Sequence, residues 1–514
     1  MNMQGVSKPQ TLFKTNLMVL AVFAFFLLTK FVRVFPLDVS EGLAYWTYTD
    51  WLVDYSAGFV RRGLSGELID FLSTYVHPQT VVAILAWIIF VGVVLGYVRL
   101  LSRSIKTLPA FLLAALLFLP SLLPFYLYEH DAFGRKEIIG YLLLLYHLYA
   151  LEVAKPVAPG VSFRQDSYVK RILPLTFLFI PIHILVHESS FLLFLPVHVL
   201  ITYTSLRSRF SAGSRPLNFR LLLLYLPALV TFAVVFLWGR PEFETAYNIC
   251  RKWQLADALG GQVCRATGNP MRALPGSLSA LPWTFSQAIS IPLSFTPPMV
   301  LAWFVNFLLV GSVTIYVGRL TAGFLRPQTT LQIAELEAPQ TYARAMSYKY
   351  FLLPLLLSAP LYILGWDIGR WFAVTCLNYV MLSLSPELHG AETQRVIKAK
   401  TVTRLRYGLL LIVSGVILFT GIYPDWIGLS RDNVIATPLL ILGGIIPLTF
   451  VLGQGYEKYL ARNPEFARGA FPYVLNGLFL LGIIISLRMP YCCEHDGWKM
   501  LAEPVQLLIK NMIN

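Results

Sequence analysis

Runs of about twenty consecutive apolar residues recur along the whole chain, and they limit its fold more than any other feature. A helix needs about 20 residues to cross about 30 Å of hydrocarbon, and about thirteen runs approach that length. Their approximate spans are 15 to 35, 79 to 98, 109 to 128, 137 to 153, 172 to 187, 190 to 204, 219 to 238, 296 to 317, 350 to 364, 371 to 385, 406 to 423, 434 to 453 and 470 to 487. Only 13% of the residues are charged, roughly half the share in soluble domains. The sequence therefore predicts an all-α, polytopic transmembrane helix bundle that forms a single domain over residues 1–514.

Lys and Arg gather in every second loop of this predicted bundle, and short basic loops stay on the cytoplasmic side. These residues are Lys8 and Lys14, then Arg99, Arg103 and Lys106, then Lys155, Arg164, Lys170 and Arg171, then Arg207, Arg209, Arg215 and Arg220, with further groups at 319–349, 398–406 and 458–468. We expect a cytoplasmic N-terminus and, with an odd number of spans, a C-terminus outside. The net charge of +14 then reflects topology, and no nucleic-acid partner is expected. The pattern suits a bacterial inner membrane.

The loops on the predicted outer side have a different composition. They mix Asp, Glu, His and Arg with Trp and Tyr, and they cover 36–78, 128–137, 186–190, 239–295, 365–371 and 423–433, followed by a C-terminal tail, 490–514. We therefore expect any chemistry to take place on the outer face.

The first outer loop contains DYSAGFVRRGLSG at 54–66. Arg61 and Arg62 lie on the side where topology gives no reason for positive charge, so each needs an anionic partner. Asp54, Glu67 or a bound anion could supply it. The glycines allow backbone to approach a ligand closely or to adopt positive φ, and the arginine fork matches phosphate. A lipid-linked phosphate or pyrophosphate is the expected ligand. The alternative is a structural loop in which Arg and Asp pair with each other or bind lipid headgroups.

Acidic residues surround the aromatic segment LAYWTYTDWLVDY of the same loop. Asp38 and Glu41 precede it, and Asp50 and Asp54 lie within it. The aromatic residues predict an amphipathic helix in the headgroup region. A carboxylate there could act as the general base that accepts a proton from an attacking hydroxyl, or it could be an ordinary solvated residue.

With these loops in place, the chain resembles the GT-C class of membrane glycosyltransferases, which transfer a sugar from a polyprenyl-phosphate donor outside the membrane. The resemblance is one of architecture over the whole chain. It implies a catalytic carboxylate in the first outer loop, matched by position to Asp38 or Glu41, with Asp54 as a further candidate. The loop has DVSE instead of a DxD pair, so a requirement for a divalent metal stays open. The implied partners are a lipid-linked sugar and membrane lipids.

The chain also resembles O-antigen-type polysaccharide polymerases, which hold pyrophosphate with arginines on the outer face. GRKE at 134–137 and WDIGRW at 366–371 fit that role through Arg135 and Arg370, with Lys136 beside the first. In a helical WDIGRW, Asp367 and Arg370 would stand at i and i+3 and could simply neutralise each other.

Histidines paired with acids give another interpretation. His130 with Asp131, His187 with Glu188, and His495 with Asp496 lie in predicted outer loops, and imidazole with carboxylate suits zinc. No HExxH spacing supports a metal-dependent membrane hydrolase, which stays a second alternative. His187 and Glu188, in a tight turn between two apolar runs, are candidates to line a pocket.

Cys250 and Cys264 share the 239–295 loop, so a disulfide between them is expected, although a bridge from this loop to Cys492 or Cys493 is also open.

The sequence has no Walker motif and no convincing internal repeat of the transporter type. A transporter or flippase nevertheless remains the first alternative, since Pro181, Pro196, Pro354 and Pro360 could kink spans. A transporter needs ionisable groups at mid-membrane, whereas these charges cluster in the outer loops.

Overall fold

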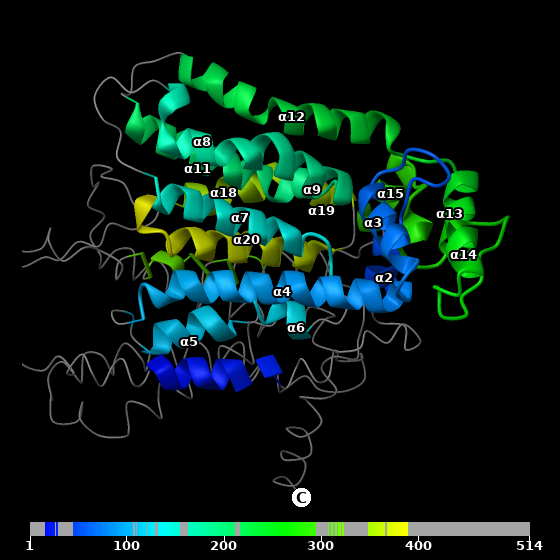
Figure 1. Cartoon of the computed structure of the whole chain (residues 1–514), viewed down its shortest axis with the longest axis horizontal. Coiled ribbons are helices and arrows are strands. Elements are labelled where there is room, and N and C mark those ends of the chain that lie inside the picture. Colours follow the sequence, from blue (N-terminus) through cyan, green and yellow to red (C-terminus); the bar gives the residue numbers. More distant parts are fainter. Residues whose placement is uncertain are drawn as a thin grey trace, which may run out of the picture.

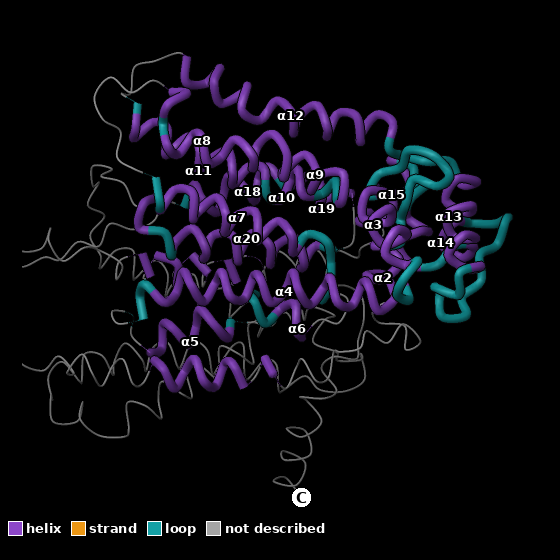
Figure 2. The backbone as a smooth tube through the Cα atoms, viewed as in Figure 1, coloured by secondary structure: helices purple, strands orange, loops and turns teal. Residues whose placement is uncertain are grey.

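The computed structural model describes residues 16–25, 27–28, 45–105, 108, 110–119, 121–128, 132–154, 163–210, 216–293, 348–364 and 367–388, with scattered positions between 307 and 322. Within these residues every regular element is helical, as Figure 2 shows. The predicted all-α class is therefore confirmed for the described part of the chain.

Four helical segments in that part are long and apolar enough to cross a membrane. They are Pro78–Ser102 (α4), Ser167–Val186, Ser190–Arg209 and Phe219–Trp238, the last within α12 (Pro216–Trp238). The second joins α8 (Ser167–Pro174), a π-helical turn Leu175–Phe179 and α9 (Ile180–Val186), and the third joins α10 (Ser190–Leu193) and α11 (Leu195–Arg209). By length and composition the chain is thus a membrane protein, while the predicted runs from residue 406 onward lie outside the described residues.

Shorter helices fill the bundle between these segments. They are Asn16–Phe25, α5 (Ala110–Phe118), α6 (Phe125–Tyr128), α7 (Ile138–Glu152), α18 (Lys349–Leu357), α19 (Ala359–Leu364) and α20 (Ile368–Ser383), with 3₁₀ turns at Phe163–Gln165 and Pro386–Leu388. Every residue of α20 is buried, which places this helix in the middle of the bundle. By contrast, α12 carries exposed Phe236, Leu237 and Trp238, as a helix at the edge of a membrane bundle would.

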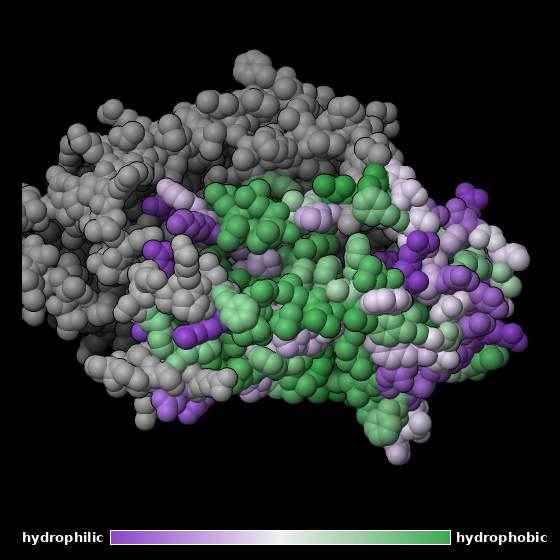
Figure 3. Space-filling model, turned by 90° about the horizontal axis from the view of Figure 1, so that it is seen from above, coloured by the Kyte–Doolittle hydropathy of each residue, from purple (hydrophilic) through white to green (hydrophobic). Residues whose placement is uncertain are grey.

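Figure 1 shows the long helices side by side, with a cap of short helices beyond one end. The cap consists of α2 (Tyr45–Trp51), α3 (Gly63–Ser73), α13 (Phe243–Leu255), α14 (Pro270–Ala273), a 3₁₀ turn Gly276–Ala280 and α15 (Phe285–Leu293). We call the end of the bundle that carries this cap the loop end. Hydrophilic side chains gather over it, whereas apolar side chains cover the middle of the bundle (Figure 3).

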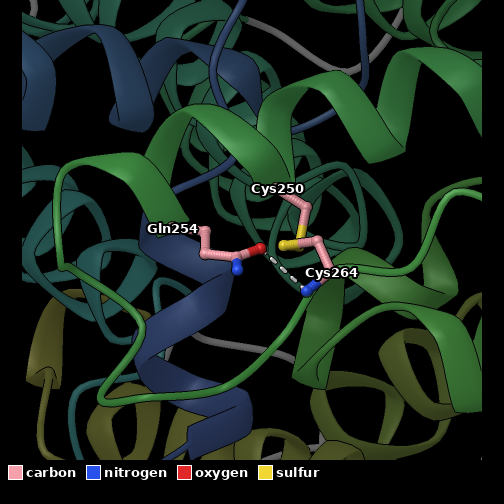
Figure 4. Close-up of a disulfide and its surroundings, with 3 residues drawn as sticks. All are labelled: Cys250, Gln254 and Cys264. Carbon is pink, nitrogen blue, oxygen red and sulfur yellow. Dashed lines mark hydrogen bonds between the residues drawn. A yellow bond between two sulfur atoms is a disulfide. The ribbon is translucent and has the colours of Figure 1, made fainter.

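Within the cap, Cys250 of α13 forms a disulfide with Cys264 (Figure 4). The backbone N–H of Cys264 also donates to the Gln254 side chain at 2.9 Å. The segment after the disulfide returns to α2, where the Ser277 N–H donates to Thr49 Oγ1 and the Ser277 hydroxyl donates to the Trp46 carbonyl. The first and fourth predicted outer loops therefore fold together as one layer.

Candidate functional site

The backbone around Arg62 has an unusual conformation. Arg62 precedes α3 with φ 67°, in the left-handed region, which costs a residue with a side chain about 1–2 kcal/mol. Two glycines follow within the first turn of α3, at 63 and 66, and neither position has space for a side chain. A Cβ at Gly63 would meet the Tyr55 ring, and one at Gly66 would lie 2.1 Å from the Val53 carbonyl oxygen. A residue stays in this conformation only where the surrounding structure holds it there, and such residues are concentrated at functional sites.

The Arg62 guanidinium bridges two carboxylates from distant parts of the chain. Its Nε and Nη2 donate to the two oxygens of Glu188, each at 2.7 Å, and its Nη1 donates to Asp50 Oδ1 at 3.1 Å. Asp50 lies in α2, and Glu188 lies in the tight turn between α9 and α10. Arg62 therefore fastens the cap to the bundle through a bidentate pair and a second charge-assisted bond.

Lys136 lies next to Arg62 and is fully buried. Its Nζ is 3.7 Å from Asp50 Oδ2 and donates to the Arg62 carbonyl at 3.3 Å. Buried Arg135 also acts electrostatically on Asp50. Asp50 is thus the carboxylate on which three cationic side chains converge.

A second group of charges continues from this one toward α20. Glu137 at the start of α7 lies 3.3 Å from His187 Nε2 and 3.0 Å from Arg370 Nε. Arg370 also donates to Asp367 at 2.6 Å, so the expected i, i+3 pair is present and is extended by Glu137. We call the whole set the charged cluster; its members are Asp50, Arg61, Arg62, Arg135, Lys136, Glu137, His187, Glu188, Asp367 and Arg370.

Arg61 forms the most open side of the charged cluster. Its Nη2 donates to the Ala280 and Leu281 carbonyls, and its Nη1 lies 3.6 Å from Glu188. Its side chain is 27% exposed and that of Glu188 is 17% exposed. The Nε of Arg61 is itself buried and has no hydrogen-bond partner among the described residues. The cluster is therefore open to solvent where Arg61 meets Glu188.

The electrostatics favour anions. Burial would raise the pKa of the Asp50 carboxyl, but Lys136 and Arg62 lower it well below its usual range. Burial lowers the pKa of Lys136 to about 8, against the opposing effect of Asp50. Burial also lowers the pKa of Arg61, as do Arg62 and exposed Arg240. The cluster holds five cationic side chains and four carboxylates, which leaves a surplus of positive charge beside Arg61.

Asp54 belongs to a separate group. Its carboxylate accepts bonds from the N–H and hydroxyl of Ser56 and pairs with Lys252 of α13 at 2.8 Å. Lys252 also pairs with Asp70. Glu67 accepts from the Tyr55 N–H. The carboxylate partners of Arg61 and Arg62 are therefore Glu188 and Asp50, whereas Asp54 and Glu67, two of the partners considered from the sequence, pair elsewhere.

The charged cluster gathers eight of the residues singled out from the sequence, namely Arg61, Arg62, Arg135, Lys136, His187, Glu188, Asp367 and Arg370. Asp38, Glu41, His130 and Asp131 lie outside the described residues. Asp50 and Glu137 are central to the cluster but were not selected as site residues. Their position beside selected residues, Asp50 in the aromatic segment and Glu137 next to Lys136, is the signal that could have identified them.

The described residues hold no group of three or more His, Cys, Asp or Glu side chains arranged to bind a metal ion. His187 faces Glu137, while Glu188 faces Arg62, so the expected His187–Glu188 pair is divided between two partners. The metal-site interpretation of His130 and His495 falls on residues that the structure does not describe.

No protein-family model, curated protein or solved structure matches this chain.

Proposed function

We propose that the protein is a membrane glycosyltransferase or polymerase that takes a sugar from a polyprenyl-phosphate or polyprenyl-pyrophosphate donor and transfers it to a lipid-linked or cell-envelope acceptor. The observation that carries this proposal is the pair Arg61 and Arg62 at the solvent-accessible side of a buried, positively charged cluster, with Arg62 in a left-handed backbone conformation. Paired guanidinium groups are well suited to phosphate oxygens.

The place of the cluster in the bundle supports an outer-face reaction. Described parts of five predicted outer loops contribute to the cap and the cluster, while Arg103 and Arg209 mark the opposite end through pairs with Glu152 and Asp166. We therefore propose about thirteen spans, a cytoplasmic N-terminus and an active face outside a bacterial inner membrane. The membrane would deliver the polyprenyl tail, and the cap would receive the phosphate.

In the proposed reaction an acceptor hydroxyl attacks the anomeric carbon as the bond to the phosphate oxygen breaks. The phosphate leaves with the electron pair and is stabilised by the arginines, and a carboxylate takes the hydroxyl proton. Asp38 and Glu41, just before α2, are proposed for that role. Asp54 is a weaker choice, because Ser56 and Lys252 occupy its oxygens.

The test is binding of polyprenyl phosphate and polyprenyl pyrophosphate to the purified full-length protein in detergent. Arg61→Ala and Arg135→Ala are compared with wild type, and Arg272→Ala, an exposed arginine on α14, is the matched control. We expect binding that needs the phosphate group, a loss of at least tenfold in Arg61→Ala, and no change in Arg272→Ala. Absence of phosphate-dependent binding in a folded wild-type protein rejects the proposal.

A buried polar network favours a transporter as the second candidate. His147 Nδ1 and His198 Nδ1 lie 2.8 Å apart, and His147 Nε2 lies 2.7 Å from the Tyr168 hydroxyl. These side chains come from α7, α11 and α8 and are buried. Ionisable groups inside a membrane bundle often mark proton paths, although they also fasten helices together.

Proton flux separates these two roles. Purified protein is placed in vesicles that contain a pH-sensitive dye, and a potassium diffusion potential drives protons inward. A transporter that uses this network carries protons faster than protein-free vesicles, and His198→Phe abolishes the difference. Equal rates in wild-type and protein-free vesicles remove this candidate and leave the network as a fastening between helices.

A further inference from the structure

We propose that Glu188 is an internal competitor for the ligand: its carboxylate occupies the phosphate position on Arg61 and Arg62 and is displaced when the ligand binds. This inference rests on the proposed function, because it assumes that these arginines receive a phosphate group. It adds a specific role for Glu188, as a stand-in for the anion.

The contacts of Glu188 are those that a phosphate group would make. Both of its oxygens accept from Arg62 in a fork, and Arg61 Nη1 approaches one of them. Carboxylate and phosphate bind guanidinium groups in the same bidentate geometry. A phosphate, with more charge and a third oxygen, can also engage Arg61 Nη1, which lies 3.6 Å from Glu188.

The two carboxylates on Arg62 differ in their ability to leave. Asp50 has no exposed side-chain surface and is also held by Lys136. Glu188 is partly exposed, at the side of the cluster where solvent enters. A ligand that arrives from solvent therefore meets Glu188 first, while Asp50 stays in place and keeps the guanidinium oriented.

The local backbone permits this movement. Glu188 lies in the turn between α9 and α10, where its carbonyl accepts from the Phe191 N–H at 3.1 Å. Rotation of the side chain breaks no helix hydrogen bond. The exchange therefore leaves the backbone hydrogen bonds of this turn intact.

Displacement changes the proton affinity of Glu188. Burial raises the pKa of its carboxyl, whereas Arg62, Arg61 and His187 lower it well below its usual range. The other charges nearby are Lys136 and Asp50. When a phosphate takes over the arginines, Glu188 loses the positive charges that lower its pKa and gains a negative neighbour, so its pKa rises and it binds a proton more readily. Ligand binding is then coupled to proton uptake, and its affinity rises as pH falls.

The experiment is titration calorimetry of polyprenyl phosphate into wild type, Glu188→Gln and Glu244→Gln in detergent. Glu188→Gln removes the competing charge and keeps the shape, while Glu244→Gln removes an exposed carboxylate of α13. We expect Glu188→Gln to bind at least tenfold more tightly than wild type, and Glu244→Gln to match wild type. A purely structural carboxylate predicts the opposite, because its loss disturbs Arg62 and weakens binding.

Proton uptake gives a second measurement that needs no variant. Wild-type binding heats are measured at one pH in buffers with different ionisation enthalpies, and Glu188→Gln corrects for ionisation of the phosphate itself. We expect more proton uptake by wild type than by Glu188→Gln. If wild type binds the probe as tightly as Glu188→Gln and takes up no more protons than that variant, the competitor role is wrong and the proposed function stands. If no protein binds the probe, both are rejected.

Discussion

Both ends of the bundle carry ion pairs, and the pairs around Asp50 differ in burial from those around Arg103. At the loop end, Asp50, Lys136 and Glu137 have no exposed side-chain surface. At the opposite end, Arg103 pairs with Glu152 and Glu387, and these side chains are 25–30% exposed. Arg99, which also reaches Glu152, is 55% exposed. The same residue types are therefore fully buried around Asp50 and partly exposed around Arg103, although the Arg209–Asp166 pair at the opposite end is also largely buried, at 13% and 2% exposed.

This difference separates two roles for charge in a membrane protein. Exposed pairs cost little to form and contribute little, about 0–1 kcal/mol each. Buried pairs lose their hydration, and replacing them with apolar residues is often neutral or stabilising. The loop end therefore keeps a costly arrangement that stability alone does not require, which favours a binding role there and a topological role at the opposite end.

The largest effect is expected from Arg62→Ala, which leaves Asp50 and Glu188 without their shared cation. Removing one partner of a buried pair costs about 3–5 kcal/mol. We expect a corresponding fall in the unfolding midpoint, measured by intrinsic fluorescence during thermal denaturation in detergent.

Arg62→Gly is the matched control for the backbone. Glycine adopts the observed positive φ without strain, so Arg62→Gly should be more stable than Arg62→Ala by about 1 kcal/mol. Equal stability of the two variants would show that the left-handed conformation does not persist. If each variant loses less than about 1 kcal/mol of stability, the charged cluster contributes no more than the exposed ion pairs at the opposite end.

The next effect is a dependence of folding stability on pH, which arises from Lys136. The pKa of Lys136 is about 8 in the folded protein and about 10.4 in an unfolded chain. Between these values the unfolded state binds more protons, so stability rises with pH, at up to about 1.4 kcal/mol per unit. Below pH 8 both states are protonated and the contribution is constant.

Unfolding midpoints of wild type and Lys136→Met between pH 7 and 10 measure this contribution. We expect the wild-type midpoint to rise, relative to that of the variant, above pH 8. If the two profiles run parallel, Lys136 titrates as an ordinary exposed lysine, and the charged cluster is not shielded from solvent.

A similar but local effect is expected for the disulfide in the cap. The cysteines are 14 residues apart, and closing a loop of that size contributes about 3 kcal/mol in the chain-entropy description. Cys250→Ser with Cys264→Ser should loosen α13, which holds Lys252 against Asp54. Limited proteolysis should then cut the cap faster, and reductant should reproduce this in wild type. An unchanged cleavage rate would show that packing alone holds the cap.

The sequence predicted the helical class and the grouping of polar loops because both depend on local composition. Apolar runs fix where helices lie, and short loops return each helix to the same two ends. The partners in the charged cluster could not be predicted in this way. Arg62 and Glu188 are 126 residues apart, and the packing of α3 against α9 brings them together.

Asp50 and Asp54 show where local reasoning stops. Both lie in one aromatic segment, and nothing in their spacing ranks one above the other. Because α2 ends at Trp51, the chain turns between them, so that Asp50 faces the bundle and Asp54 faces α13. Similarly, the glycines suggested close approach or positive φ: Gly58 adopts a φ of 125°, whereas Gly63 and Gly66 lie within α3 and permit close packing, and Arg62 adopts the left-handed conformation.

The smallest effect is expected at the opposite end, from Arg103→Ala. Its side chain is a quarter exposed and its partners are hydrated, so the loss should be about 1 kcal/mol or less and should shrink further as salt screens the pair. Unfolding midpoints at low and high salt measure it, with Arg62→Ala as the reference. Because the Arg62 pairs are buried, salt should change their contribution much less. A loss in Arg103→Ala as large as that in Arg62→Ala would show that exposure does not separate the two ends, and the argument for binding at the loop end would lose its basis.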